Sequence, residues 1–96
     1  MPGKTRTTRW DAAALLKTDA SIRAYLEAAL EDGDPGVITA ALGDIARAKG
    51  MTSIARKAGL GRESLYKALS AGGNPEFATV MRVVEALGLA LVVRAR

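Results

Sequence analysis

The sequence predicts an all-α domain of five helices that ends in a short C-terminal β-strand. Two observations predict the helices: apolar residues recur at helical spacing through most of the chain, and glycines and Asp-Pro or Asn-Pro pairs separate these stretches. The strand is predicted by the last apolar stretch, LALVVRA, which is β-branched and too short for a helix after a glycine. The 96 residues suit a single domain with a modest core.

The first two predicted helices have caps at both ends. Thr18 or Asp19 can cap the first helix, which ends at Gly33. Asp34 followed by Pro35 starts the second helix, and Gly50 ends it. Aspartate caps free N–H groups, and proline at the first helical position loses no hydrogen bond. The side chains expected in the core are Ile22, Leu26, Ala29, Leu30, Ile38, Ala41, Leu42 and Ile45.

Three shorter helices are predicted to follow. Thr52 can cap the third, which Gly59 closes, and the fourth runs from Arg62 to about Ser70. The fifth starts at Asn74-Pro75 and ends at Gly88. The apolar residues of the third and fifth helices are Ile54, Ala55, Ala58, Phe77, Val80, Met81, Val84 and Leu87.

The strand is expected at residues 89–94. No other segment is predicted as a strand, so its backbone groups are expected to pair with the same strand of a second subunit, making a homodimer. A tail docked on its own core is the alternative. Residues 1–18, which mix Lys, Arg and Thr with Trp10, are interpreted as an N-terminal arm, and residues 19–96 as one domain.

Charge is unevenly distributed along a chain of net charge +4. Residues 19–36 contain one arginine and five acids, a net charge of −4, whereas residues 45–74 contain six bases and one acid, a net charge of +5. The basic half suits an anionic partner. The acidic segment, residues 27–34, and the amphipathic helix before it are opposite in charge to the basic half and could bind a basic protein. The alternative is a solvated helix end with no partner.

Several functions are disfavoured by composition. The absence of cysteine excludes disulfides and agrees with a cytoplasmic location, and no apolar run is long enough to span a membrane. There is no histidine for base catalysis or zinc binding, and Gly59-x-Gly61 lacks a third glycine and a preceding strand for a dinucleotide loop. We therefore expect no enzyme, no cofactor and no metal.

Residues 52–70 instead have the spacing of a helix-turn-helix. Such a unit needs a small residue where two helices cross, a glycine in the turn and an apolar residue on the second helix; Ala55, Gly59 and Leu65 stand at these offsets. On a helical wheel Leu65, Ala68 and Leu69 face inward. The outward set is Arg62, Glu63, Tyr66, Lys67 and Ser70. This pattern suits a recognition helix in a DNA major groove.

The stretch MTSIARKAGLGRESLYKALS, followed by NPEFATVMRVVEALGL, resembles the Xre/Cro-type helix-turn-helix family, which implies a lambda-repressor-like fold. The whole chain resembles the HigA-like addiction module antidotes, or antitoxins. The segments that carry this second resemblance are YLEAAL, ALGDIARAKGM, RESLYKALS and GNPEFATV.

The second resemblance implies an antitoxin of a type II toxin–antitoxin module. Such a protein would bind a cognate RelE/HigB-type toxin, which has a ribosome-dependent mRNA interferase fold, and would repress its own operon by binding double-stranded operator DNA. The family's DNA-facing positions fall on Thr52, Ser53, Gly61, Arg62, Glu63, Ser64, Tyr66 and Lys67. Many Xre domains have glutamine at the position of Ser53, and Gly61 can offer only its backbone.

We expect Arg62 to contact a guanine edge or a phosphate, Tyr66 a sugar or thymine methyl, and Lys67 a phosphate. Arg56 and Lys57 would anchor the DNA backbone beside the groove. Glu63 could accept a hydrogen bond from cytosine, or it could repel phosphates and sharpen specificity.

Two other classes of protein stay open. One is a stand-alone, phage-like Xre/Cro-type repressor without a toxin partner. The other is a helical interaction module that has lost DNA binding; its association with DNA would be weak and insensitive to salt, whereas phosphate contacts weaken steeply as salt rises.

Overall fold

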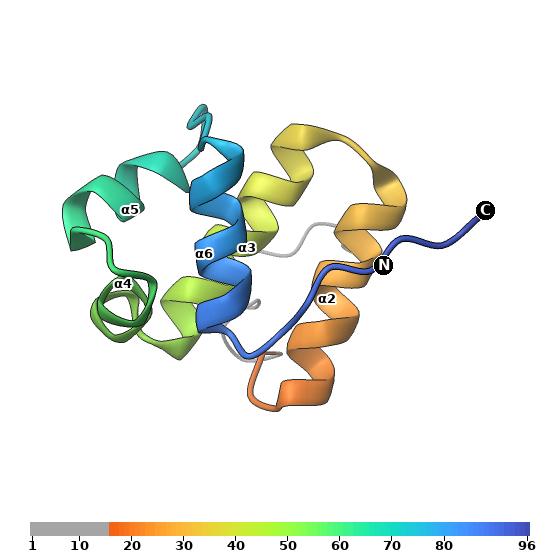
Figure 1. Ribbon diagram of the computed structural model, residues 1–96, viewed down its shortest axis with the longest axis horizontal. Coiled ribbons are helices and arrows are strands. Elements are labelled where there is room, and N and C mark those ends of the chain that lie inside the picture. The colour runs from red at the N-terminus through yellow and green to blue at the C-terminus, as the bar shows by residue number, and fades with distance from the viewer. Residues whose placement is uncertain (1–15) are drawn as a thin grey trace, which may run out of the picture.

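The computed structural model describes residues 16–96, and this part of the chain folds into five α-helices (Figure 1). The helices are α2 (Asp19–Asp32), α3 (Pro35–Lys49), α4 (Met51–Ala58), α5 (Arg62–Ala68) and α6 (Phe77–Ala86). The predicted helical class is confirmed. Residues 1–15 of the predicted N-terminal arm, with Trp10, lie outside the described residues. Within residues 16–96, no helix has both the length and the apolar character that a membrane span requires.

The first two helices begin where the sequence predicts. Thr18 and Ser21 form a capping box: the Thr18 hydroxyl accepts from the Ser21 N–H at 3.0 Å, and the Ser21 hydroxyl accepts from the Thr18 N–H at 3.2 Å. The Asp34 carboxylate accepts from the Gly36 N–H at 3.2 Å. Each cap satisfies N–H groups that have no partner inside their helix. Local sequence therefore determines both starts.

Two predicted caps are wrong. Thr52 lies inside α4, which begins at Met51, because Gly50, at φ 104°, ends α3 and is also the N-cap of α4. Asn74 and Pro75 precede α6 instead of opening it, and Glu76 is the N-cap. The loop before α6 is pressed against the end of α5: a Cβ on Gly73 would clash with the Ala68 carbonyl group. This contact places the loop and delays the helix.

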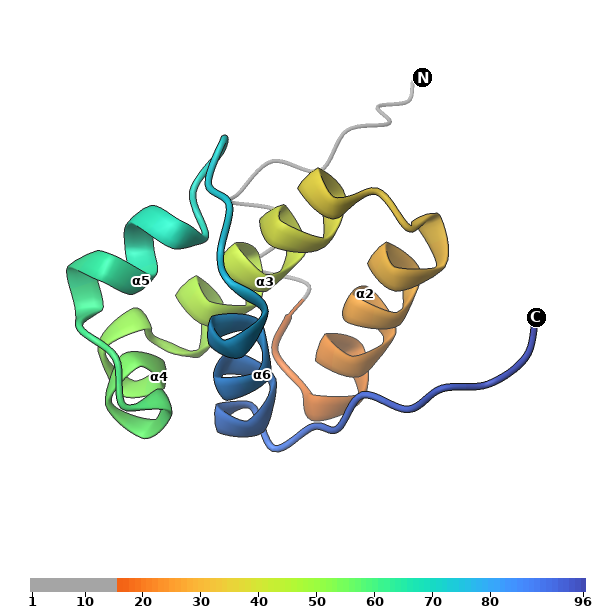
Figure 2. The ribbon, with the colours of Figure 1, turned by 45° about the horizontal axis from the view of Figure 1, so that its top comes forward.

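The predicted C-terminal strand at residues 89–94 is also wrong. Residues 89–96 have no regular secondary structure, and no strand occurs elsewhere in residues 16–96. β-branched residues favour a strand only when a neighbouring strand supplies hydrogen bonds and side-chain contacts. The described chain supplies no such neighbour, so the segment runs along α2 as an irregular tail (Figure 2).

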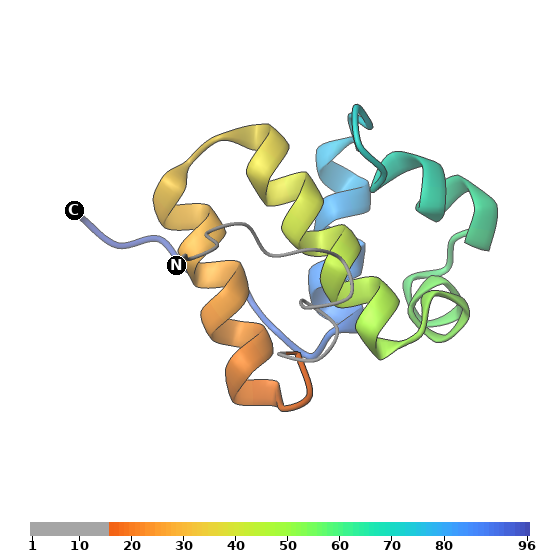
Figure 3. The ribbon, with the colours of Figure 1, turned by 180° about the vertical axis from the view of Figure 1, so that it is seen from behind.

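The helices form a single core. α2 packs on α3, α3 packs on α4, and α4 packs on both α5 and α6. Seen from behind, α3 crosses the middle of the domain (Figure 3). The most deeply buried large side chains are Leu42, Ile45, Ile54, Leu65, Leu69, Val83 and Val84. Leu16, at the start of the described chain, joins the same core.

Gly43 allows α3 to approach the end of α5. A Cβ at this position would lie 2.5 Å from the Leu69 carbonyl oxygen, closer than real Cβ contacts come. Any larger residue would push the end of α5 away from α3. Gly43 therefore helps to set where α5 sits.

A half-buried polar network joins α2 to α3. The Tyr25 hydroxyl donates to Asp44 Oδ2 at 2.7 Å, and Arg47 Nη2 donates to Asp44 Oδ1 at 3.1 Å. Burial raises the pKa of Tyr25 to about 12, from an ordinary value of 10.0; the hydrogen bond to Asp44 and the negative charge of Asp44 act in the same direction, whereas Arg47 opposes them. The folded state therefore favours the protonated phenol.

This network predicts a loss of stability at alkaline pH. The pKa of Tyr25 is higher in the folded than in the unfolded chain, so its contribution is fully present below pH 10.0 and is lost as the pH rises through about 12. The chain has two tyrosines, so Tyr66→Phe leaves Tyr25 as the only phenol. We expect the tyrosinate absorbance of the folded Tyr66→Phe variant to rise with a midpoint near 12. A midpoint near 10.0, the ordinary value, would contradict the network.

Candidate nucleic-acid interface

A tight turn joins α4 to α5. Gly59 has φ 71° and ψ 32°, a left-handed conformation that residues with a Cβ rarely adopt. The Gly59 N–H donates to the Arg56 carbonyl at 3.2 Å, and the Leu60 N–H donates to the Ala55 carbonyl at 2.9 Å. These bonds end α4 and redirect the chain, so that α5 begins at Arg62.

The inner side of this α4–α5 unit is apolar. Ala55 is buried on α4, and its small side chain allows neighbouring elements to come close. Leu65 is 1% exposed and is the buried residue of α5, and Leu69 follows it into the core as the helix ends. The predicted inward positions of Ala55 and Leu65 are confirmed. They hold α5 against the domain with its other side facing outward.

The predicted DNA-facing residues lie on the outer side of the same unit. The exposed ones are Thr52, Arg56, Lys57, Gly61, Arg62, Glu63, Ser64, Tyr66 and Lys67. Ser53 is half-buried. All ten come from α4, its turn and α5, which contact each other directly. The fold thus gathers onto one supersecondary unit the residues that the sequence predicts as a site.

Four cations of this unit have no ion-pair partner within residues 16–96, as is also true of Lys17, Arg23, Arg82 and Arg96. Arg47 pairs with Asp44 at 3.1 Å, and Lys49 lies 3.7 Å from Asp19. In contrast, the cations of α4 and α5 form no ion pair and no side-chain hydrogen bond with another residue of the described chain; they are Arg56, Lys57, Arg62 and Lys67. Clustered cations without acidic partners attract polyanions.

Two residues near this surface differ from the helical-wheel prediction. Ser70 is half-buried, and its hydroxyl donates to the Tyr66 carbonyl at 2.5 Å as α5 ends, so it is not part of the outward set. Phe77, predicted in the core, is 73% exposed. It shares a helix face with Val84 but lies two turns earlier, beyond the end of the buried cluster. Periodicity alone cannot show where a core ends.

The Tyr25–Asp44–Arg47 network was not predicted from the sequence. Tyr25 and Asp44 are 19 residues apart on different helices, so only the packing of α2 on α3 brings them together. Within residues 16–96, no three His, Cys, Asp or Glu side chains are grouped as metal ligands. The chemistry available at the α4–α5 unit is that of cations, hydroxyl groups and one aromatic ring.

Comparisons with known proteins cover nearly the whole chain. A family model described as "Probable addiction module antidote protein" matches residues 6–95. An uncharacterized protein of Haemophilus influenzae is 52% identical over 80 residues, which cover 83% of this chain and 82% of that protein. No solved structure matches the chain.

Proposed function

Because the chain belongs to the family of probable addiction module antidote proteins, we propose that it is the antitoxin of a type II toxin–antitoxin module. It binds and neutralises its toxin directly and represses its own operon. The family match over residues 6–95 carries the proposal, since an antidote implies a toxin partner and a regulatory binding protein instead of an enzyme. The exposed cations of α4 and α5 support the repressor role.

In this proposal α4 and α5 form an Xre/Cro-type helix-turn-helix, and α5 enters the major groove of operator DNA. Arg62 contacts a guanine edge or a phosphate, Lys67 contacts a phosphate, and Tyr66 packs on a sugar or a thymine methyl. The support is geometric: these three side chains are exposed on α5, whereas Leu65 is buried.

The remaining proposed contacts come from α4, the turn and the first turn of α5. Arg56 and Lys57 anchor the DNA backbone, and Gly61 offers its backbone N–H. Glu63 either reads a cytosine or rejects wrong sequences by repelling phosphates. The hydroxyl groups available to phosphate or base edges are those of Thr52, Ser53 and Ser64.

We further propose that the toxin is of the RelE/HigB type and that the antitoxin binds DNA as a homodimer. The toxin class rests on the sequence resemblance to HigA-like antidotes. One recognition helix reads few base pairs, so a dimer on half-sites about 34 Å apart supplies the specificity that a repressor needs. We assign self-association to α6, whose first residue, Phe77, is exposed.

Co-expression with the adjacent small open reading frame tests the proposed function. We expect that frame, induced alone, to arrest growth, and we expect this protein to relieve the arrest and to co-purify with its product. If the antitoxin relieves growth arrest by binding the toxin directly, the two proteins form a complex that is stable enough to be purified. The control is the same induction with an empty vector.

A different result would favour the second candidate, a stand-alone Xre/Cro-type repressor. If the neighbouring frame is expressed yet not toxic and forms no complex, while this protein still binds the DNA upstream of its gene, the antitoxin role is wrong. The exposed cations of α4 and α5 would then act in repression alone.

A further inference from the structure

The short helix α5 depends on the rest of the domain for its position. It is seven residues long, and Gly61 at its N-cap has no side chain to bond the free N–H groups. Isolated helices of this length are not stable in water. Leu65 within α5 and Leu69 at its C-cap are each 1% exposed in the core. Side-chain anchors can adapt by changing rotamer, so closer contacts are needed to fix the tilt of the helix.

Two glycines meet the backbone at the end of α5 directly. A Cβ on Gly43, which is buried on α3, would lie 2.5 Å from the Leu69 carbonyl oxygen. A Cβ on Gly73, in the loop after α5, would lie 2.8 Å from the Lys67 carbonyl oxygen and would clash with the Ala68 carbonyl group. Three successive carbonyl groups are therefore in contact with glycines, and main-chain groups cannot give way by a change of rotamer.

Hydrogen bonds after α5 return the chain to the helix end. The Leu69 N–H donates to the Leu65 carbonyl at 3.0 Å, and the Gly73 N–H donates to the Ser70 carbonyl at 2.8 Å. Gly72 has φ 80°, which allows the chain to reverse between these bonds. The turn thus places Gly73 against the carbonyl groups that it contacts.

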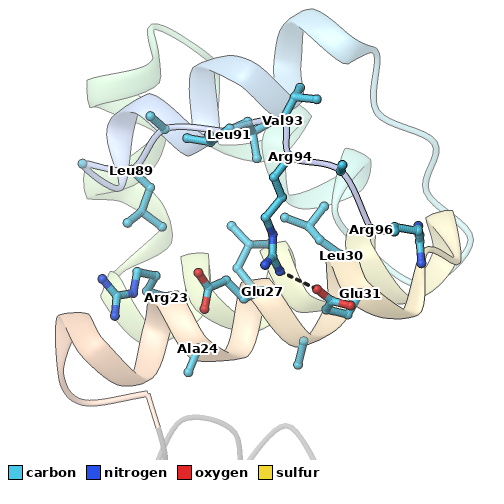
Figure 4. A pocket seen from close by; sticks show the side chains of 16 residues that line it. Arg23, Ala24, Glu27, Leu30, Glu31, Leu89, Leu91, Val93, Arg94 and Arg96 are labelled. Atoms are coloured by element: carbon cyan, nitrogen blue, oxygen red, sulfur yellow. Dashed lines mark hydrogen bonds and ion pairs between the residues drawn. The ribbon is translucent and has the colours of Figure 1, made fainter.

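The C-terminal tail is held in a different way. Figure 4 shows Arg94 reaching from the tail to Glu31 on α2, with 2.8 Å between Nη2 and Oε2 and the two side chains 80% and 64% exposed. Exposed ion pairs of this kind contribute little stability and can open without moving either backbone. The end of α5 has no such freedom, because its contacts with the glycines are made by main-chain atoms.

Gly43 also links the end of α5 to the polar network between α2 and α3. A Cβ on Gly43 would lie 3.1 Å from Arg47 Nη2, which donates to Asp44 Oδ1. Asp44 in turn accepts from the Tyr25 hydroxyl at 2.7 Å. The Arg47 side chain is therefore held beside Gly43 by its ion pair. A methyl group added at Gly43 would have to displace this pair, the end of α5, or both.

We infer that Gly43 and Gly73 are positioning residues for the operator contacts of α5, and this inference rests on the proposed repressor function. Arg62 lies at the other end of the helix from Leu69, about 10 Å away along the axis. A shift at one end tilts the helix and moves the Arg62 guanidinium, whereas a binding contact needs placement to within about 0.5 Å. The two glycines thereby act on which sequences α5 can read.

Gly43→Ala and Gly73→Ala test the inference, since each adds one methyl group against the end of α5. The measurement is the ratio of two Kd values from fluorescence anisotropy, that for a scrambled duplex divided by that for the duplex from upstream of the gene. Circular dichroism at the same temperature checks that each variant is folded.

Two controls separate position from general stability. Gly36→Ala makes the same change at the exposed start of α3, where a Cβ would lie 3.8 Å from its nearest neighbour, Asp34 Oδ1. Ile22→Ala removes buried volume from α2 and lowers stability without adding a contact.

We expect the Kd ratio to fall at least about tenfold in both glycine variants and to stay within about twofold of the wild-type ratio in both controls. The Kd for the scrambled duplex should change little, because the cations of α4 and α5 still attract phosphates. A glycine variant that folds and keeps the wild-type ratio would overturn the inference. An equal loss in Ile22→Ala would also overturn it, because general loosening of the core would then explain the result.

The remaining outcomes also decide the matter. If Gly43→Ala does not fold, Gly73→Ala gives the answer alone; failure of both to fold would assign the glycines to the core as a whole and overturn the inference. A wild-type protein without preference for the upstream duplex would overturn the proposed repressor role and the inference with it. A wild-type preference that the glycine variants retain would overturn the inference alone.

Discussion

Replacing Leu65 by alanine is expected to lower the free energy of unfolding by about 2–5 kcal/mol. Leu65 is 1% exposed and is the buried side chain of α5, so alanine leaves a cavity between α5 and the rest of the core. A domain of this size has a total stability of roughly 5–10 kcal/mol, so the loss is a large fraction of it. Urea denaturation followed by circular dichroism measures the change.

The neighbouring residue offers a matched control. Ser64→Ala removes an exposed side chain one position earlier on the same helix and is expected to change stability by less than about 0.5 kcal/mol. A Leu65→Ala variant as stable as the wild-type protein would mean that α5 is not held by this contact. The geometric basis for an outward-facing α5 would then fail.

Arg62→Ala is expected to weaken binding to the operator by about 1–3 kcal/mol, which is roughly 5-fold to 150-fold in Kd. Arg62 is exposed at the first position of α5 and forms no ion pair with another residue of the described chain, so its removal costs little stability. Fluorescence anisotropy with a duplex from upstream of the gene measures the affinity at several salt concentrations.

Salt dependence separates the two roles proposed for Arg62. If the side chain contacts a phosphate, the slope of log Kd against log salt falls by about one in the variant. If it reads a guanine, the slope changes little and one base position of the operator becomes tolerant. Arg23→Ala on α2 is the control, since it removes an exposed arginine outside both the α4–α5 unit and α6. Equal loss in both variants would argue for general charge attraction in place of a groove contact.

Local signals predicted much of the fold. The starts of α2 and α3 follow from Thr18 and Asp34, because a cap depends on residues within one turn of it. The inward positions of Ala55 and Leu65 follow from helical spacing, which needs no knowledge of the partner surface. The exposed residues of the candidate site follow from the same geometry.

The wrong predictions below depend on packing that the local pattern does not specify. Residues 89–94 have the composition of a strand but no neighbouring strand among the described residues. Phe77 has the period of the α6 core face but lies beyond the end of that core. Asn74-Pro75 has the form of a helix start, yet the contact between Gly73 and the Ala68 carbonyl group delays α6.

The sequence by itself determined five helices, the turn at Gly59, the acidic and basic halves of the chain and a resemblance to addiction module antidotes. These features depend on composition or on interactions between residues a few positions apart. Neither requires the tertiary structure to be known. Only the tertiary structure decided that Lys49 lies near Asp19, how α2 meets α3 through Tyr25 and Asp44, and where the C-terminal tail lies. The physical reason is that these contacts join residues far apart in the chain, whose distances are fixed only when the helices pack.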